Sequence, residues 1–143
     1  MNLSPHFTLE ELTVSETAAR KGISNVPDND ALMNLRRLAL FLESVRDTIG
    51  KPIKVNSAYR APEVNASVGG AKTSQHCLGL AADIRVPSMT PDQVVRAIKS
   101  SGLVYDQLIR EFDSWTHVSI PPKDAKPRKM ALVIDKSGTR AFA

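Results

Sequence analysis

Cysteine is almost absent from this sequence, because Cys77 is the only one among 143 residues. A single cysteine cannot form an intrachain disulfide, nor can it supply a zinc site of several thiolates. Any metal in this chain must therefore be held mainly by histidine and by aspartate or glutamate. A lone cysteine is most often a small buried apolar residue, so we assign Cys77 no catalytic role.

The sequence also lacks long apolar runs, and none is long enough to span a bilayer. Its first residues, from Met1 to His6, have neither the basic segment nor the apolar core of a secretory signal peptide. We therefore expect a monomer that folds in a cytoplasm and does not insert into a membrane. A substrate outside the membrane would be reached only with help from another component.

Charge is modest, with 19 basic and 15 acidic residues and a net charge of +4. No nucleic-acid-binding module or interleaving of aromatic and basic residues is present, so we expect no nucleic-acid partner. The basic excess lies late, and we expect residues 122–143 to form a solvated extension beyond a core of about residues 3–121. Its basic residues are Lys123, Lys126, Arg128 and Lys129.

Local patterns predict helices in the first part of the chain and strands in the second. That order favours an α+β fold in one domain, residues 1–143, with a small antiparallel sheet and helices packed on one side of it. The expected helices begin at a capping box at residues 8–11 and cover residues 15–21, 30–48, 61–66 and 91–100. The expected strands cover residues 53–57, 81–86, 106–110, 115–120 and 131–134.

A histidine and a carboxylate, His76 and Asp83, stand seven positions apart with Gly79 between them. His76 is expected on a loop and Asp83 on the strand at 81–86, so the two can converge on one point. Neutral imidazole and carboxylate are both good zinc ligands, and His117 on the strand at 115–120 is the candidate third ligand. A histidine beside an aspartate is also common as a structural pair, so this spacing alone does not decide between the two.

The strand at 115–120 has a period of two. Trp115, His117 and Ser119 share one face of it, and the alternate residues form an apolar face suited to a core. A histidine that faces away from the core beside a tryptophan suits the floor of a pocket.

Three patterns together resemble one family. They are Ser-x-His-x-x-Gly-x-Ala-x-Asp at residues 74–83, Trp-x-His at 115–117 and Ser-x-x-Arg at 57–60. They are similar to the D-Ala-D-Ala carboxypeptidase family of zinc peptidases, which includes phage endolysins and shares its fold with the signalling domain of Hedgehog proteins. The resemblance runs from Leu3 to about Pro121 and is greatest to small phage and prophage members.

The resemblance implies a catalytic zinc site in which His76, Asp83 and His117 leave a fourth position for water. A carboxylate must accept a proton from that water. Hedgehog-like members carry a glutamate six residues before the last ligand, which is Glu111 here, and Asp113 is the second candidate. Other relatives carry the base three residues before that ligand, where this sequence has Ser114.

The resemblance also implies residues that contact the substrate. Arg60 matches an arginine that binds a carbonyl or carboxylate of the substrate, for which a planar guanidinium is suited. Ser74 is expected to orient the loop of His76 or to donate a hydrogen bond near the site. Trp115 stands where relatives often have histidine, and it is expected beside the substrate.

The function implied by the family is zinc-dependent hydrolysis of peptide bonds in peptidoglycan stem peptides. The expected setting is a phage or prophage endolysin of the L-alanyl-D-glutamate endopeptidase type, which waits in the host cytoplasm before lysis and acts at the cell wall. A D-Ala-D-Ala carboxypeptidase is the alternative within the same class. A zinc-stabilised cell-wall-binding or virion domain without activity is the alternative from another class.

Overall fold

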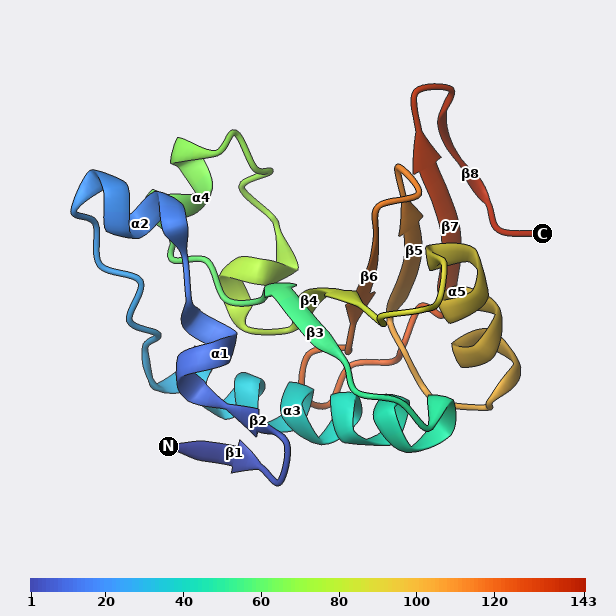
Figure 1. Cartoon of the computed structure of the whole chain (residues 1–143). Coiled ribbons are helices and arrows are strands. Elements are labelled where there is room, and N and C mark those ends of the chain that lie inside the picture. Colours follow the sequence, from blue (N-terminus) through green and yellow to red (C-terminus); the bar gives the residue numbers. More distant parts are fainter.

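The computed structural model describes all 143 residues and places six of its eight strands in one sheet (Figure 1). The predicted α+β class is confirmed. In chain order the elements are β1 (Asn2–Ser4), β2 (Phe7–Thr8), α1 (Leu9–Thr13), α2 (Glu16–Lys21), α3 (Asn29–Ile49), β3 (Lys54–Ser57), α4 (Pro62–Ser67), the 3-10 helix η1 (Gln75–Leu78), β4 (Ala81–Arg85), α5 (Pro91–Ser100), β5 (Gln107–Glu111), β6 (Trp115–Ser119), β7 (Met130–Asp135) and β8 (Gly138–Ala141).

The long helix α3 carries much of the core. It begins after Asp28, whose side chain accepts a hydrogen bond of 2.8 Å from the Ala31 amide, and it ends at Gly50 with φ of 74°. The apolar stripe that predicted this helix is buried, as at Leu35 and Leu42. None of the helices is both long and apolar enough to cross a bilayer.

The sheet has the order β3-β4-β6-β5-β7-β8. Every neighbouring pair is antiparallel except β5 and β7, which are parallel. Because side chains alternate along a strand, the register assigns each residue to a face. Ala82 lies opposite Val118 on the face that meets the helical core, whereas Asp83 lies opposite His117 on the other face.

The C-terminal residues do not form an extension outside the core. β7 pairs with β5 along five positions, β8 pairs with β7, and Val133 and Phe142 belong to the main hydrophobic cluster. Residues after about 121 were expected to form a solvated extension, and in the structure they instead add two strands to the sheet, with β7 as the hydrogen-bonding partner on the second edge of β5.

Candidate metal centre

His76 is placed by one turn of 3-10 helix. The Ser74 hydroxyl accepts a hydrogen bond of 3.2 Å from the His76 amide, which starts η1, and Gly79 ends it with φ of 76°. A Cβ on Gly79 would lie 2.6 Å from the Ala31 carbonyl oxygen of α3, so only glycine allows this approach. The His76 loop is thereby fixed against the main helix.

The tautomer of His76 follows from its backbone contact. Its Nδ1 lies 2.6 Å from the Ala58 carbonyl oxygen, which can only accept, so Nδ1 carries the proton. Nε2 then keeps its lone pair, and it lies 3.4 Å from Oδ2 of Asp83. A carbonyl that orients a ligating histidine in this way is common around metals.

The other two groups meet across the ladder of β4 and β6. Asp83 is paired directly with His117, and its Oδ1 lies 3.0 Å from Nδ1 of that residue. The rings of His76 and His117 are edge to face with centroids 5.2 Å apart. Burial alone would raise the pKa of Asp83, but the two imidazoles beside it, His117 and His76, hold that pKa well below its usual range.

The three side chains fit a zinc ion. Their ligand atoms all lie within 4.8 Å of one another. Bonds of about 2.0–2.1 Å to a tetrahedral zinc place two ligand atoms roughly 3.3 Å apart, close to the separations of 3.4 and 3.0 Å found for Asp83. Two imidazoles and one carboxylate form a donor set typical of zinc with one coordination position left open.

Glu111 lies on the same face of the sheet as the metal group. It is paired with Trp115, which is two residues before His117 on β6. Burial raises the pKa of Glu111, and the negative charge of Asp83 raises it further, whereas the two histidines act in the opposite direction. A carboxyl group with a raised pKa beside a metal group is suited to proton transfer.

Asp113 is not brought to the metal group. It stands in the three-residue turn between β5 and β6, where Phe112 and Asp113 have φ of 52° and 51°. Its carboxylate is held by the guanidinium of Arg110, with one contact of 3.1 Å, and its side chain is 66% exposed. Because Arg110 is paired with the buried Thr116 on the core face, Asp113 is drawn away from His117.

The residues expected to contact the substrate border the metal group. The Arg60 amide donates to the His76 carbonyl at 3.1 Å, and the side-chain Nε of Arg60 is buried without a hydrogen-bond partner. The Nε1 of Trp115 is also buried without a partner. Buried donors without partners are rare in proteins, and the backbone of Arg60 is bonded to the loop that carries His76.

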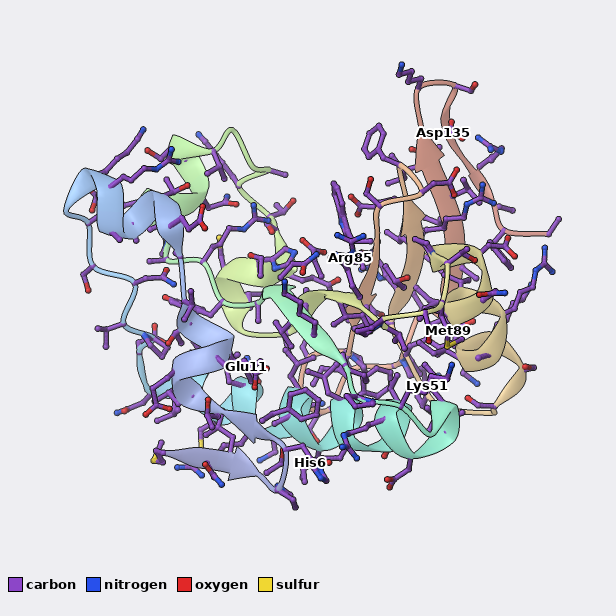
Figure 2. All side chains as sticks on the ribbon, in the orientation of Figure 1. His6, Glu11, Lys51, Arg85, Met89 and Asp135 are labelled. Carbon is purple, nitrogen blue, oxygen red and sulfur yellow. The ribbon has the colours of Figure 1, made fainter.

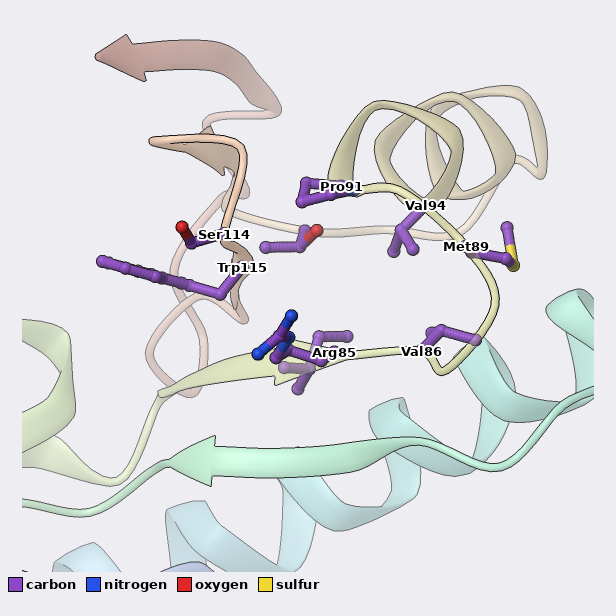
Figure 3. A pocket seen from close by; sticks show the side chains of 9 residues that line it. Arg85, Val86, Met89, Pro91, Val94, Ser114 and Trp115 are labelled. Carbon is purple, nitrogen blue, oxygen red and sulfur yellow. The ribbon is translucent and has the colours of Figure 1, made fainter. Parts of the chain in front are cut away.

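Other features of the chain lie away from this site. A crevice of about 30 Å³ lies between α5 and the ends of β4 and β6. Figure 3 shows that the Trp115 side chain extends away from it. This volume holds little more than one water molecule. His6 lies in the turn of the N-terminal hairpin (Figure 2), where its Nδ1 is 2.7 Å from Oε1 of Glu43.

Two supporting residues were missed from the sequence. The carbonyl of Ala58 could not be predicted, because every residue has one and only the fold selects which faces His76. Gln75, next to His76, donates at 2.9 Å to the buried carboxylate of Asp106, which also binds Arg128. Because Gln75 is next to a candidate ligand, the sequence could have suggested a supporting role for it. Its hydrogen-bond partner, Asp106, lies 31 residues away and could not be identified in the same way.

Comparison with known sequences agrees with this geometry. The profile of the Peptidase M15 family matches residues 5–119. The chain belongs to the Peptidase M15 family, and the predicted zinc peptidase family is confirmed. The chain is also similar to the zinc D-Ala-D-Ala carboxypeptidase of Streptomyces albus G, with 37% identity over 62 residues. That similarity covers 43% of this chain and 24% of the relative, so it spans about a quarter of the relative's length.

Proposed function

We propose that this protein is a zinc-dependent peptidase that hydrolyses peptide bonds in the stem peptides of bacterial peptidoglycan. The observation that carries the proposal is the convergence of His76, Asp83 and His117, with Glu111 on the same face of the sheet. The similarity to a D-Ala-D-Ala carboxypeptidase supports the substrate class. Zinc is the metal that the donor set favours.

Each residue has a defined part in this proposal. His76, Asp83 and His117 hold the metal, and Ala58 fixes His76 in the tautomer that leaves Nε2 free. When bound, zinc supplies Lewis acidity, which polarises a carbonyl and lowers the pKa of a water to about 7. Glu111 accepts a proton from the attacking water and passes it to the departing amine.

Arg60 orients the substrate through its guanidinium, which can form two parallel hydrogen bonds to a carbonyl or carboxylate. Its unpartnered Nε supports that part. Trp115 borders the bound peptide, and its ring lies beside Glu111, with which it is paired across the ladder of β5 and β6. Ser74 keeps the His76 loop in place through its bond to the His76 amide.

Within this class we propose an endopeptidase of the L-alanyl-D-glutamate type, acting as a phage or prophage endolysin that reaches the cell wall from the host cytoplasm. The support is the resemblance of the motifs at residues 74–83, 115–117 and 57–60 to those of small phage members. A D-Ala-D-Ala carboxypeptidase is the second candidate, because the Streptomyces relative has that activity in its name.

Product analysis on purified peptidoglycan tests the proposal. The zinc-loaded protein, the chelator-treated protein and a His117→Ala variant are incubated with cell-wall sacculi, and soluble products are identified by mass spectrometry. We expect the zinc-loaded protein alone to release stem peptides from the glycan. Release of D-alanine only would establish the carboxypeptidase, and no release by any of the three would establish a binding domain.

A further inference from the structure

Gln75 precedes His76 on η1, and its side chain is bonded to a carboxylate from a distant part of the chain. Its Nε2 donates to Oδ2 of Asp106 at 2.9 Å, across 31 positions of the sequence. The Oε1 of the same amide is buried and has no hydrogen-bond partner. A buried acceptor without a partner costs free energy, so the bond to Asp106 outweighs this cost and fixes the orientation of the amide.

Asp106 is in turn fixed to the strand that carries His117. Its side chain is 3% exposed, and its amide donates to the Ser119 carbonyl at 2.8 Å. Ser119 is the last residue of β6, two residues after His117. The Asp106 carbonyl accepts from the amide of Met130, the first residue of β7, at 2.9 Å. The sheet therefore defines the position of the carboxylate to which η1 is bonded.

The bond from Gln75 joins the two elements that carry the histidine ligands. η1 carries His76 and β6 carries His117, and their ligand atoms must lie roughly 3.3 Å apart around a tetrahedral zinc. Two further contacts of His76, with the Ala58 carbonyl and the Arg60 amide, fix it relative to the segment that follows β3. Those contacts do not tie η1 to β6, whereas the bond from Gln75 does so through Asp106.

We infer that Gln75 is a positioning residue for the metal, because its bond to Asp106 sets His76 at the separation from His117 that zinc requires. Loss of a residue that orients a metal ligand typically weakens metal binding by about 10–100-fold. Gln75 acts through the backbone of its neighbour, and the bond of His76 to Ala58 remains without it. We therefore expect the lower end of that range, about 10-fold.

Gln75→Met tests the inference, since methionine keeps the length of the side chain and removes its donor. Gln75→Ala, which adds no bulk, is measured beside it and should give the same result. Gln93→Met is the matched control, because Gln93 is exposed on α5 and its side chain accepts one hydrogen bond of 2.9 Å from the Thr90 amide. Zinc affinity is measured by competition with a chromophoric chelator well below Tm, where circular dichroism shows that each variant is folded.

Arg128→Gln separates positioning from stability. It removes a cation from Asp106 and leaves the bond from Gln75 in place. In a protein that is almost entirely folded, a loss of stability alone does not change the affinity for zinc. We therefore expect Arg128→Gln to bind zinc as the wild type does although its Tm is lower, whereas Gln75→Met binds zinc about 10-fold more weakly.

Equal zinc affinity in Gln75→Met and the control Gln93→Met would overturn the inference. A loss of affinity in Arg128→Gln as large as that in Gln75→Met would also overturn it, because the weakening would then not depend on the bond from Gln75. Neither result involves peptide cleavage, so both would leave the proposed function standing. Failure of the wild type to bind zinc would overturn the metal centre, and with it both the proposed function and the inference.

Discussion

Arg128 binds the buried carboxylate of Asp106 with two side-chain hydrogen bonds, of 3.0 and 2.6 Å. The Asp106 side chain is 3% exposed, whereas that of Arg128 is 52% exposed. Arg140 offers a matched comparison, since it is 51% exposed but binds Asp135, which is 30% exposed. Arg128→Gln and Arg140→Gln therefore remove similar cations from carboxylates that differ in burial.

The expected losses of stability differ for this reason. Breaking a buried ion pair costs about 3–5 kcal/mol, because the remaining charge stays desolvated. Asp106 keeps two bonds in Arg128→Gln, from the residue 128 amide at 2.8 Å and from Gln75 at 2.9 Å. We therefore expect a smaller loss of about 2–3 kcal/mol, or roughly 8–12 °C in Tm for a chain of this size. Arg140→Gln should lower Tm little, since exposed ion pairs contribute little.

The pH dependence gives a second measurement on the same variants. Burial acts to raise the pKa of Asp106, but hydrogen bonds from Arg128 and Gln75 hold it below its ordinary value. A lowered pKa in the folded state stabilises the protein above the unfolded value of about 3.9, and this stabilisation is lost as pH falls through the folded pKa. The gap in Tm between wild type and Arg128→Gln should thus be full at pH 7 and shrink below about pH 4.

Thermal unfolding by circular dichroism, with chelator present so that zinc does not contribute, measures both effects. Equal and small Tm changes in Arg128→Gln and Arg140→Gln would show that the burial of the partner carboxylate does not determine the loss of stability. A gap that stays constant down to pH 2 would show that the charge of Asp106 is not its source.

Four further variants test the site. His117→Ala should lose most of its zinc in elemental analysis after dialysis, and full zinc content would remove His117 from the ligand set. Glu111→Gln should keep zinc, and its turnover should fall by a factor of about 10²–10⁴. The zinc-free form of this variant should have a higher Tm than the zinc-free wild type at neutral pH, because the raised pKa of Glu111 shows that the fold disfavours its charged form. Asp113→Asn should retain turnover, and an equal loss in both variants would contradict Glu111 as the base. Arg60→Lys should keep zinc, but its kcat/KM should fall by about 10–100-fold, since lysine lacks the planar guanidinium that forms two parallel hydrogen bonds. Near-normal turnover would show that Arg60 does not contact the substrate.

Local signals in the sequence were sufficient for most of the helices. The capping box of Thr90 and Gln93 is present with bonds of 3.1 and 2.9 Å, and the helix that it starts ends near the expected residue. The long helix covers Asn29–Ile49, one residue more at each end than expected. Caps and apolar stripes depend on neighbours along the chain, and a sequence records those neighbours directly.

Long-range partners were not predictable in the same way. The basic residues before β7 have the composition of a solvated tail. One of them, Arg128, nevertheless donates to the buried carboxylate of Asp106, which stands 22 residues earlier in the chain. Strand β8 has four exposed residues without alternation of apolar and polar side chains, so the sequence has no hydrophobic period that would predict this strand. In the site, period two placed His117 and Trp115 on one face, but the register that sets Asp83 against His117 depends on pairing across the sheet.

The pairing of β4 with β6 has a consequence for the order of folding events. Asp83 and His117 are 34 residues apart and meet only when this ladder has formed. The unfolded chain offers no preformed set of three ligands, so zinc binds the native chain far more tightly than the unfolded one. If the ladder forms after the folding transition state, zinc leaves the refolding rate unchanged. The unfolding rate then falls as more of the folded protein is occupied by zinc. The metal centre would in that case increase the kinetic stability of the folded protein.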